Sequence, residues 1–174
     1  MRKIENKATV FTENTTFKSL TRTYIIQKSN INKIKTKITT DNVIINIPEN
    51  IDIKSPDIQK TIKIIIIKTL RIEAKEYLPK RTLELAQKYN FRFNKIFIKN
   101  TKTLWGSCSG RNNINFNLHL LRLPDHLIDY VIIHELCHTI QKNHGKPFWD
   151  LMDSILGNAK KLSKELKDYS IQIY

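Results

Sequence analysis

The chain has 174 residues, 40% hydrophobic and 26% charged, with a formal net charge of +14. This length and composition fit one globular domain with a sizeable core. They also exclude a membrane helix, because the densest apolar run, Ile64 to Ile67, is far shorter than the roughly 18 residues that a membrane span needs.

The compartment is predicted from the N-terminus and the cysteines. The first 16 residues lack the apolar segment of a secretory signal, and we expect a cytoplasmic protein with no membrane partner. Cys108 and Cys137 fit a reducing compartment, and without a C-x-x-C pair they do not predict a structural zinc site. Both are interpreted as small buried residues, with Cys108 a weaker candidate metal ligand.

The positive charge has two explanations. It suits an anionic partner such as nucleic acid or a nucleotide. It is also what an AT-rich coding sequence produces, since 23 lysines stand against seven arginines and isoleucine and asparagine are abundant. The second explanation is slightly favoured, and a nucleic-acid partner stays open.

The N-terminal part, residues 8–47, is predicted to be rich in β-strands. Thr23–Gln27 and Val43–Ile47 carry the β-branched and aromatic residues typical of strands. Lys33–Ile38 alternates lysine with isoleucine or threonine, which places three lysines on one face of a strand. That face is interpreted as the solvated outer face of a sheet, with an anion-binding face as the alternative.

A long helix is predicted to follow. Ser55-Pro56-Asp57 has the residues of a helix start, and apolar residues recur at helical spacing from Ile58 to Tyr77. Pro79 is predicted to break or kink this helix, leaving a short second helix near Leu83. A strand is predicted over Phe91–Ile98.

A β-hairpin is predicted next, from Leu104–Ser109 and Asn113–Leu118 around the turn Gly110-Arg111-Asn112. The exposed edge strand of such a hairpin can bind an extended peptide by main-chain hydrogen bonding. Trp105, Asn115 and Asn117 are therefore candidate substrate-binding residues. The alternative is that Trp105 is a core residue and the asparagines lie in turns or on an outer face.

The segment His134-Glu135-Leu136-Cys137-His138 carries the chemistry. Residues four apart lie on the same face of a helix, so His134 and His138 aim two imidazoles at one point, with Glu135 beside them. This is the H-E-x-x-H pattern of zinc hydrolases, with two nitrogen ligands and a carboxylate base. The surrounding helix, Leu127 to Ile140, is apolar and is predicted to be buried.

His144 follows where the helical pattern ends, and a loop there is predicted to bring a third imidazole to the same point. Three protein ligands and one water form the catalytic pattern of zinc sites. Glu165 is a weaker alternative ligand. Asp150 and Asp153 are candidate hydrogen-bond partners for a ligand histidine. His119, a lone histidine among apolar residues, is interpreted as structural.

The chain resembles a known family in several segments from about Thr21 to Leu156. These are Trp105-Gly106-Ser107-Cys108-Ser109, Asn113-Ile114-Asn115-Phe116-Asn117, Leu123-Pro124, Asp129-Tyr130-Val131, His134-Glu135-Leu136-Cys137-His138 and Asn143-His144-Gly145-Lys146-Pro147-Phe148-Trp149. They are similar to the YgjP-type metal-dependent hydrolases, relatives of the SprT-like and WLM zinc metallopeptidases. The resemblance implies zinc on His134, His138 and His144, with Glu135 as general base.

Together these observations predict a single zincin-like α+β domain over residues 1–174. A β-rich part, residues 1–50, precedes a part with the long helix, the hairpin, the H-E-x-x-H helix and short C-terminal helices, residues 51–174. The predicted function is a Zn²⁺-dependent hydrolase acting on peptides or proteins. The alternatives are a metal-dependent nucleotide pyrophosphohydrolase and a nucleic-acid-associated protease or binding domain.

Overall fold

The computed structural model describes residues 10–13, 15 and 17–171, and the predicted strand region before residue 10 lies outside them. The chain forms two compact units, one up to Thr69 and one from Leu70 to Ile171, and each is described by itself. The prediction of a single folding domain remains a prediction, since it concerns whether the two units unfold together.

The first unit contains a four-stranded sheet with the strand order β1-β2-β4-β3. Its strands are β1 (Phe17–Lys18), β2 (Thr23–Ser29), β3 (Lys35–Ile38) and β4 (Asn42–Pro48). β2 and β4 pair in parallel, while β1 and β3 pair antiparallel at the two edges. The strands predicted from β-branched residues are therefore confirmed.

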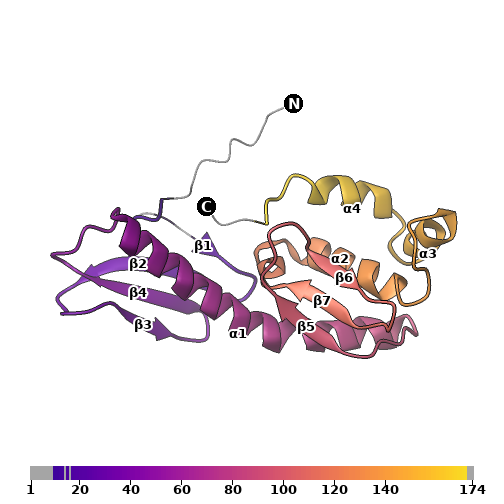
Figure 1. The fold of residues 1–174 in the computed structure, drawn as a ribbon, viewed down its shortest axis with the longest axis horizontal. Helices are drawn as coiled ribbons and strands as arrows, with labels where there is room; N and C mark the ends of the chain where they lie inside the picture. Colours follow the sequence, from indigo (N-terminus) through magenta and orange to yellow (C-terminus); the bar gives the residue numbers. More distant parts are fainter. Residues whose placement is uncertain (1–9, 14, 16, 172–174) are drawn as a thin grey trace. The chain divides into compact units, whose positions relative to one another are not determined.

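The two faces of this sheet follow from its register. Tyr24 and Ile26 on β2 oppose Val43 and Ile45 on β4, and all four side chains are buried. Lys35 and Lys37 of β3 pair with Asn46 and Ile44, which places them on the face opposite those four buried side chains, and both lysines are exposed. The predicted lysine face is thus an exposed face, and the first half of α1 lies alongside the sheet (Figure 1).

Helix α1 (Pro56–Lys88) is continuous over 33 residues and begins at the proline that the sequence indicated. The predicted break at Pro79 is wrong. Proline removes one backbone hydrogen bond, but buried residues on either side, such as Leu78 and Thr82, hold the helix in the core. The boundary between the two units falls within this helix.

The second unit contains a three-stranded sheet with the order β5-β7-β6. Its strands are β5 (Ile96–Lys99), β6 (Gly106–Cys108) and β7 (Ile114–Asn117). The predicted hairpin is confirmed as β6 and β7, and β6 lies at an edge.

The strand predicted over Phe91–Ile98 begins only at Ile96. Phe91 instead closes α1, because its amide donates to the Ala86 carbonyl at 2.8 Å after Asn90 adopts a φ of 57°. The buried Phe91 ring marks the end of the helix, which the alternating pattern of the sequence did not distinguish from a strand start.

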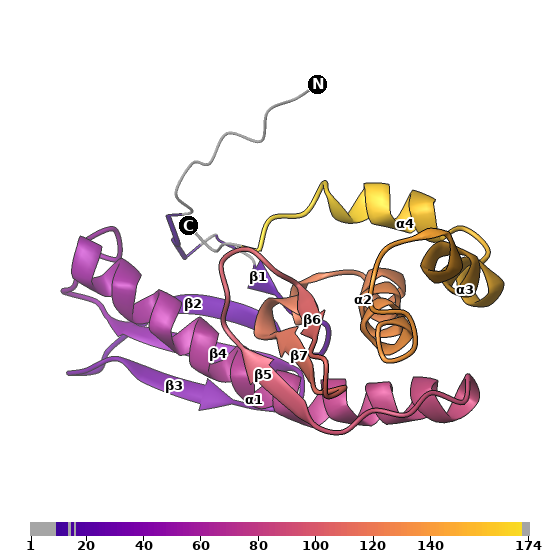
Figure 2. The ribbon, with the colours of Figure 1, turned by 45° about the vertical axis from the view of Figure 1, so that its right-hand side comes forward.

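Helical segments complete the second unit. They are η1 (Leu118–Arg122), α2 (Asp125–Cys137), α3 (Lys146–Leu156) and α4 (Ala159–Leu166). Helix α2 packs against β6, α3 and α4, and Figure 2 shows it beside the hairpin. The predicted α+β fold class is confirmed. None of the helices in the described residues is long and apolar enough to cross a membrane.

Helix α2 is also fixed to α1. Arg81 donates from Nε to Asp129 Oδ1 at 2.8 Å and from Nη2 to Oδ2 at 2.6 Å. This two-point contact orients α2 better than a single ion pair would, because the planar guanidinium matches the carboxylate. The helix that carries the candidate site is therefore held by both packing and charge.

Candidate metal centre

Three imidazoles converge at the end of α2. The Nε2 atoms of His134 and His138, one helical turn apart, are 3.2 Å from each other. His144, from the loop between α2 and α3, places its Nε2 3.0 Å from each of them. No other group of three or more metal-ligating side chains is found in the described residues.

Burial favours the neutral form of the His134 and His138 imidazoles, and His138 has a defined tautomer. Burial, and then the neighbouring His138 and His144, lower the pKa of His134 to about 3. Burial is also the largest cause that lowers the pKa of His138. The Nδ1–H of His138 donates to the Gln141 carbonyl at 2.9 Å, which leaves the Nε2 lone pair pointing at the other two rings.

This arrangement fits a divalent cation. Nitrogen ligands about 2.0–2.1 Å from a tetrahedral zinc ion lie roughly 3.3–3.4 Å from one another. The observed spacings of 3.0 to 3.2 Å are close to that value. Lone pairs of neutral imidazoles repel when they share one point, and a cation at that point turns the repulsion into attraction.

Phe148 of α3 supports all three rings. Its side chain is fully buried, and its ring centroid lies 4.9, 4.6 and 4.8 Å from those of His134, His138 and His144. It stacks on His138 with an interplanar angle of 25°. Packing against this one phenyl ring therefore helps to orient all three imidazoles.

Glu135 lies beside the cluster as a buried, unpartnered acid. It is 5% exposed, and its Oε2 has no hydrogen-bond partner within the described part of the chain. Burial raises the pKa of its carboxyl group to about 8. An unpaired buried carboxyl oxygen is costly unless a ligand or water completes it, so this atom is where a further group is expected.

Gly106 on the edge strand touches this acid. An ideal Cβ built on Gly106 would lie 2.7 Å from Oε1 and 2.8 Å from Cγ of Glu135. Those distances are far shorter than van der Waals contact, so β6 approaches the carboxylate this closely only because residue 106 has no side chain. The sequence resemblance included Gly106 without indicating this contact, which depends on tertiary packing.

Several predicted neighbours of the site lie elsewhere. Asp150 pairs with Lys146 at 2.7 Å, and Asp153 accepts from the Ala159 amide at 2.8 Å, so neither partners a ligand histidine. Glu165 pairs with His126 at 2.7 Å rather than joining the cluster. Ile140, predicted to be buried, is 57% exposed because α2 ends at Cys137.

The candidate substrate-binding residues lie on the hairpin. Asn115 donates from Nδ2 to Ser107 Oγ at 3.1 Å across β7 and β6. Asn117 is buried, and its amide donates to Thr101 and to the Leu104 carbonyl, which holds the 101–104 loop. The side chain of Trp105 is half-buried, and its backbone carbonyl accepts a hydrogen bond from the backbone N–H of Asn117.

His119 has a structural environment. It is 4% exposed in η1, and its Nε2 lies 3.1 Å from Asn100 Oδ1. Burial, and then the charge of Arg122, lower its pKa to about 4. It is not part of the group of three histidines.

Lys142 contacts the hairpin turn, and the sequence did not predict this contact. Its ammonium donates to Asn112 Oδ1 and to the Ser109 carbonyl in the hairpin turn. The loop that carries His144 is therefore tied to the β6–β7 hairpin. Nothing in the local sequence pattern distinguishes this lysine from the other 22 in the chain.

A buried H-E-x-x-H helix with a third histidine beside it is the arrangement of a metal-dependent hydrolase. The family model described as YgjP-like, metallopeptidase domain, matches residues 1–169. The chain therefore belongs to the YgjP-like metallopeptidase family, and it is a hydrolase with a metal cofactor and peptide or protein substrates.

No curated protein matches the chain. Among solved structures, it is similar to the metallopeptidase zymogen abylysin of Pyrococcus abyssi, with 18% identity and a TM-score of 0.46 over 52% of this chain and 92% of that chain. It is also similar to the zymogen jannalysin of Methanocaldococcus jannaschii, with 22% identity and a TM-score of 0.46 over 52% and 93%.

Proposed function

We propose that this chain is a zinc-dependent metallopeptidase in which His134, His138 and His144 hold the ion and Glu135 is the general base. The observation that carries the proposal is the convergence of three Nε2 atoms within 3.0 to 3.2 Å, next to a buried carboxyl group. A catalytic zinc site has three protein ligands of this kind and leaves a fourth position open.

A zinc ion held there would polarise the scissile carbonyl and lower the pKa of its water to about 7. The positive charge of a bound cation would favour the ionised form of Glu135. Its carboxylate can then accept the proton of the attacking water on its unpartnered oxygen and pass that proton to the leaving amine. Its low exposure keeps bulk water away from the proton transfer. Gly106 keeps the carboxylate in place by leaving room for it.

The edge strand β6 is the proposed binding place for the peptide. Among the described strands it pairs with β7 alone, so its other side offers main-chain groups to an extended substrate. Asn115 lies on the adjacent strand, Asn117 holds the loop before β6, and Trp105 directly precedes β6. These three residues are proposed to shape the binding site beside Glu135.

The test is to load purified protein with zinc and measure hydrolysis of a mixed peptide library. Glu135→Gln is expected to keep one zinc ion per chain and to lose activity by at least about a hundredfold, because only proton transfer is removed. His134→Ala is expected to lose the zinc ion itself. Glu165→Gln, which alters an acid paired with His126, serves as the matched control with unchanged activity.

Two results would contradict the proposal. Full peptidase activity in Glu135→Gln would assign the base to another residue. Hydrolysis of nucleoside triphosphates, but of no peptide, by the zinc-loaded protein would favour the pyrophosphohydrolase alternative. Loading with other first-row metals in parallel identifies the ion that supports turnover, since imidazoles bind several of them.

A further inference from the structure

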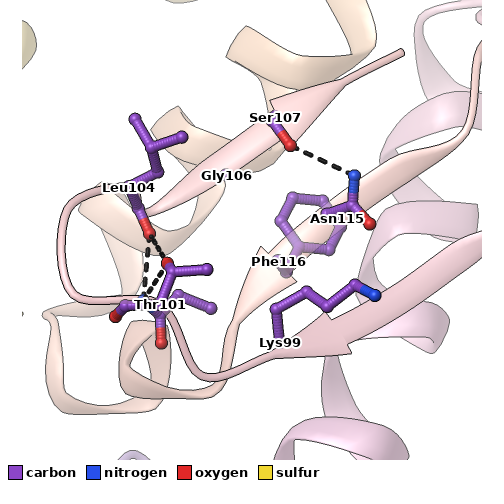
Figure 3. Close-up of a pocket in the computed structure, with 8 residues that line it drawn as sticks. Lys99, Thr101, Leu104, Gly106, Ser107, Asn115 and Phe116 are labelled. Carbon is purple, nitrogen blue, oxygen red and sulfur yellow. Dashed lines mark hydrogen bonds between the residues drawn. The ribbon is translucent and has the colours of Figure 1, made fainter.

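A pocket of about 250 Å³ lies on the three-stranded sheet of the second unit. Figure 3 shows it between the strands and the loop that precedes β6. Its walls come from three strands and one loop, and they include Lys99, Leu104, Gly106, Ser107, Asn115 and Asn117.

The pocket and Glu135 lie on opposite faces of β6. Ser107 opposes Asn115, and the two side chains are hydrogen-bonded on the pocket face. Gly106 opposes Phe116, and a side chain at position 106 would point at Glu135. Successive residues of a strand face opposite sides, so one strand separates the pocket from the candidate base.

A peptide paired with the free edge of β6 would use both faces. Its side chains would alternate, one towards the Glu135 side and the next towards the side of Ser107 and the pocket. A residue adjacent to the cleaved bond would therefore place its side chain at the mouth of the pocket. A pocket in this position would contact a substrate side chain, whatever the chemistry of its lining.

The chemistry of the lining favours an anion. Lys99 is the one charged residue among the pocket-lining residues of the described chain. Within those described residues it forms no ion pair, and its ammonium lies over the Phe97 ring at 5.4 Å. The Asn117 side-chain amide donates to the 101–104 loop. At the floor, the Asn115 side-chain amide donates to Ser107 Oγ, so the hydroxyl proton of Ser107 can still be donated to a ligand.

The distance across the sheet selects the length of the side chain. Lys99 belongs to β5, and the order β5-β7-β6 puts a substrate strand three positions from it. Three strand spacings amount to about 14 Å between the backbones. The four-carbon stem of Lys99 spans part of the distance to the substrate backbone. A substrate side chain longer than that of aspartate is needed to reach the Lys99 ammonium, and it would run along the apolar wall of Leu104.

We propose that this pocket binds a glutamate side chain of the substrate, next to the cleaved bond, through the ammonium of Lys99. The proposal rests on the proposed peptidase function and adds the substrate class. The substrates are peptides with a glutamate at one of the alternate positions whose side chains face the pocket side of β6. Lys99 is a specificity-determining residue in this account, and it takes no part in proton transfer.

The experiment compares peptides with glutamate, aspartate, glutamine or lysine at each of three positions on either side of one cleaved bond. For the wild-type protein, kcat/KM is expected to be about fivefold higher for glutamate than for glutamine at alternating positions, as for a partly exposed ion pair. Lys99→Glu reverses the preference towards lysine, and Lys99→Met removes it. Lys160→Glu on α4 makes the same charge change at an exposed site and leaves the preference intact.

Binding of fluorescent peptides to the Glu135→Gln variant separates the two proposals. Cleavage with no glutamate preference, or a preference shifted equally by Lys99→Glu and Lys160→Glu, overturns the pocket assignment and leaves the peptidase proposal standing. Binding of the glutamate peptide that weakens about fivefold or more in Glu135→Gln/Lys99→Glu supports the pocket without any turnover. If the protein neither cleaves nor binds any of the peptides, both the pocket assignment and the peptidase proposal are overturned.

Discussion

The contact between Gly106 and Glu135 gives a sharp prediction for Gly106→Ala. The new methyl group would meet Oε1, Cγ and Cδ of Glu135 at 2.7, 2.8 and 3.0 Å. Carbon atoms pack at about 3.5–4.0 Å, so the strand or the carboxylate must move by roughly 1 Å. A displacement of that size in a reacting group costs about a hundredfold in rate, or about 2.7 kcal/mol of transition-state stabilisation.

The assay is kcat/KM on a cleaved peptide, with the zinc content measured on the same samples. Gly106→Ala is expected to keep one zinc ion per chain, because the methyl group meets the base and not the three histidines. Gly110→Ala in the hairpin turn is the control, since no atom lies within 4 Å of its added Cβ. A wild-type kcat/KM in Gly106→Ala would show that the position of Glu135 does not depend on the missing side chain at residue 106.

Three further predictions concern metal affinity and stability. Phe148→Ala removes the ring that packs against the three imidazoles and is expected to cost about 3–5 kcal/mol of stability. Its zinc affinity, measured by competition with a chelator, is expected to fall tenfold or more. Phe148→Leu should retain most of the stability and most of the zinc affinity. The pKa of His119 is lowered from 6.5 to about 4, so its stabilising contribution is fully present above pH 6.5 and is lost as pH falls towards 4. The free energy of unfolding, measured by denaturation at both pH values, should fall by up to about 3 kcal/mol less in His119→Gln than in the wild type. An equal fall in the two proteins would contradict the lowered pKa of His119. A double-mutant cycle of Arg81→Ala and Asp129→Ala should give a coupling of about 1–2 kcal/mol, because the contact is two-point and partly buried; a coupling near zero would make it incidental.

Local patterns sufficed for much of the fold. The spacing of His134 and His138 depends only on helix geometry, and the Gly110-Arg111-Asn112 turn depends only on residues beside it. The start of α1 at Pro56 and the end of α3 at Gly157, with a φ of 71°, are likewise signalled by single residues. Each of these features is decided within a few residues of the chain.

Three predictions failed because tertiary contacts outweighed the local sequence pattern. Pro79 does not end α1, because buried neighbours maintain the helix against the local preference of proline. Asp150 and Asp153 were candidate partners of the histidines because they lie close in sequence. Asp150 instead pairs with Lys146, and Asp153 accepts from the backbone amide of Ala159. Alternation over Phe91–Ile98 concealed the end of a helix.

The surroundings of the candidate site were the least accessible to sequence reasoning. The three histidines were singled out by their spacing and by resemblance, and the structure brings their Nε2 atoms together. The approach of Gly106 to Glu135 and the placing of Lys99 behind the edge strand arise from strand order. A β-strand order joins residues far apart in sequence, and no short window contains it.

In the proposed centre, three imidazoles and one solvent molecule surround a single ion. X-ray absorption at the zinc edge, on protein loaded with one equivalent of zinc, measures that shell directly. We expect three nitrogen neighbours and one oxygen at about 2.0–2.1 Å, with one nitrogen lost in His144→Ala. A sulfur neighbour at about 2.3 Å, such as the thiolate of Cys108 would supply, or an unchanged shell in His144→Ala, would contradict the assignment of the three histidines as ligands.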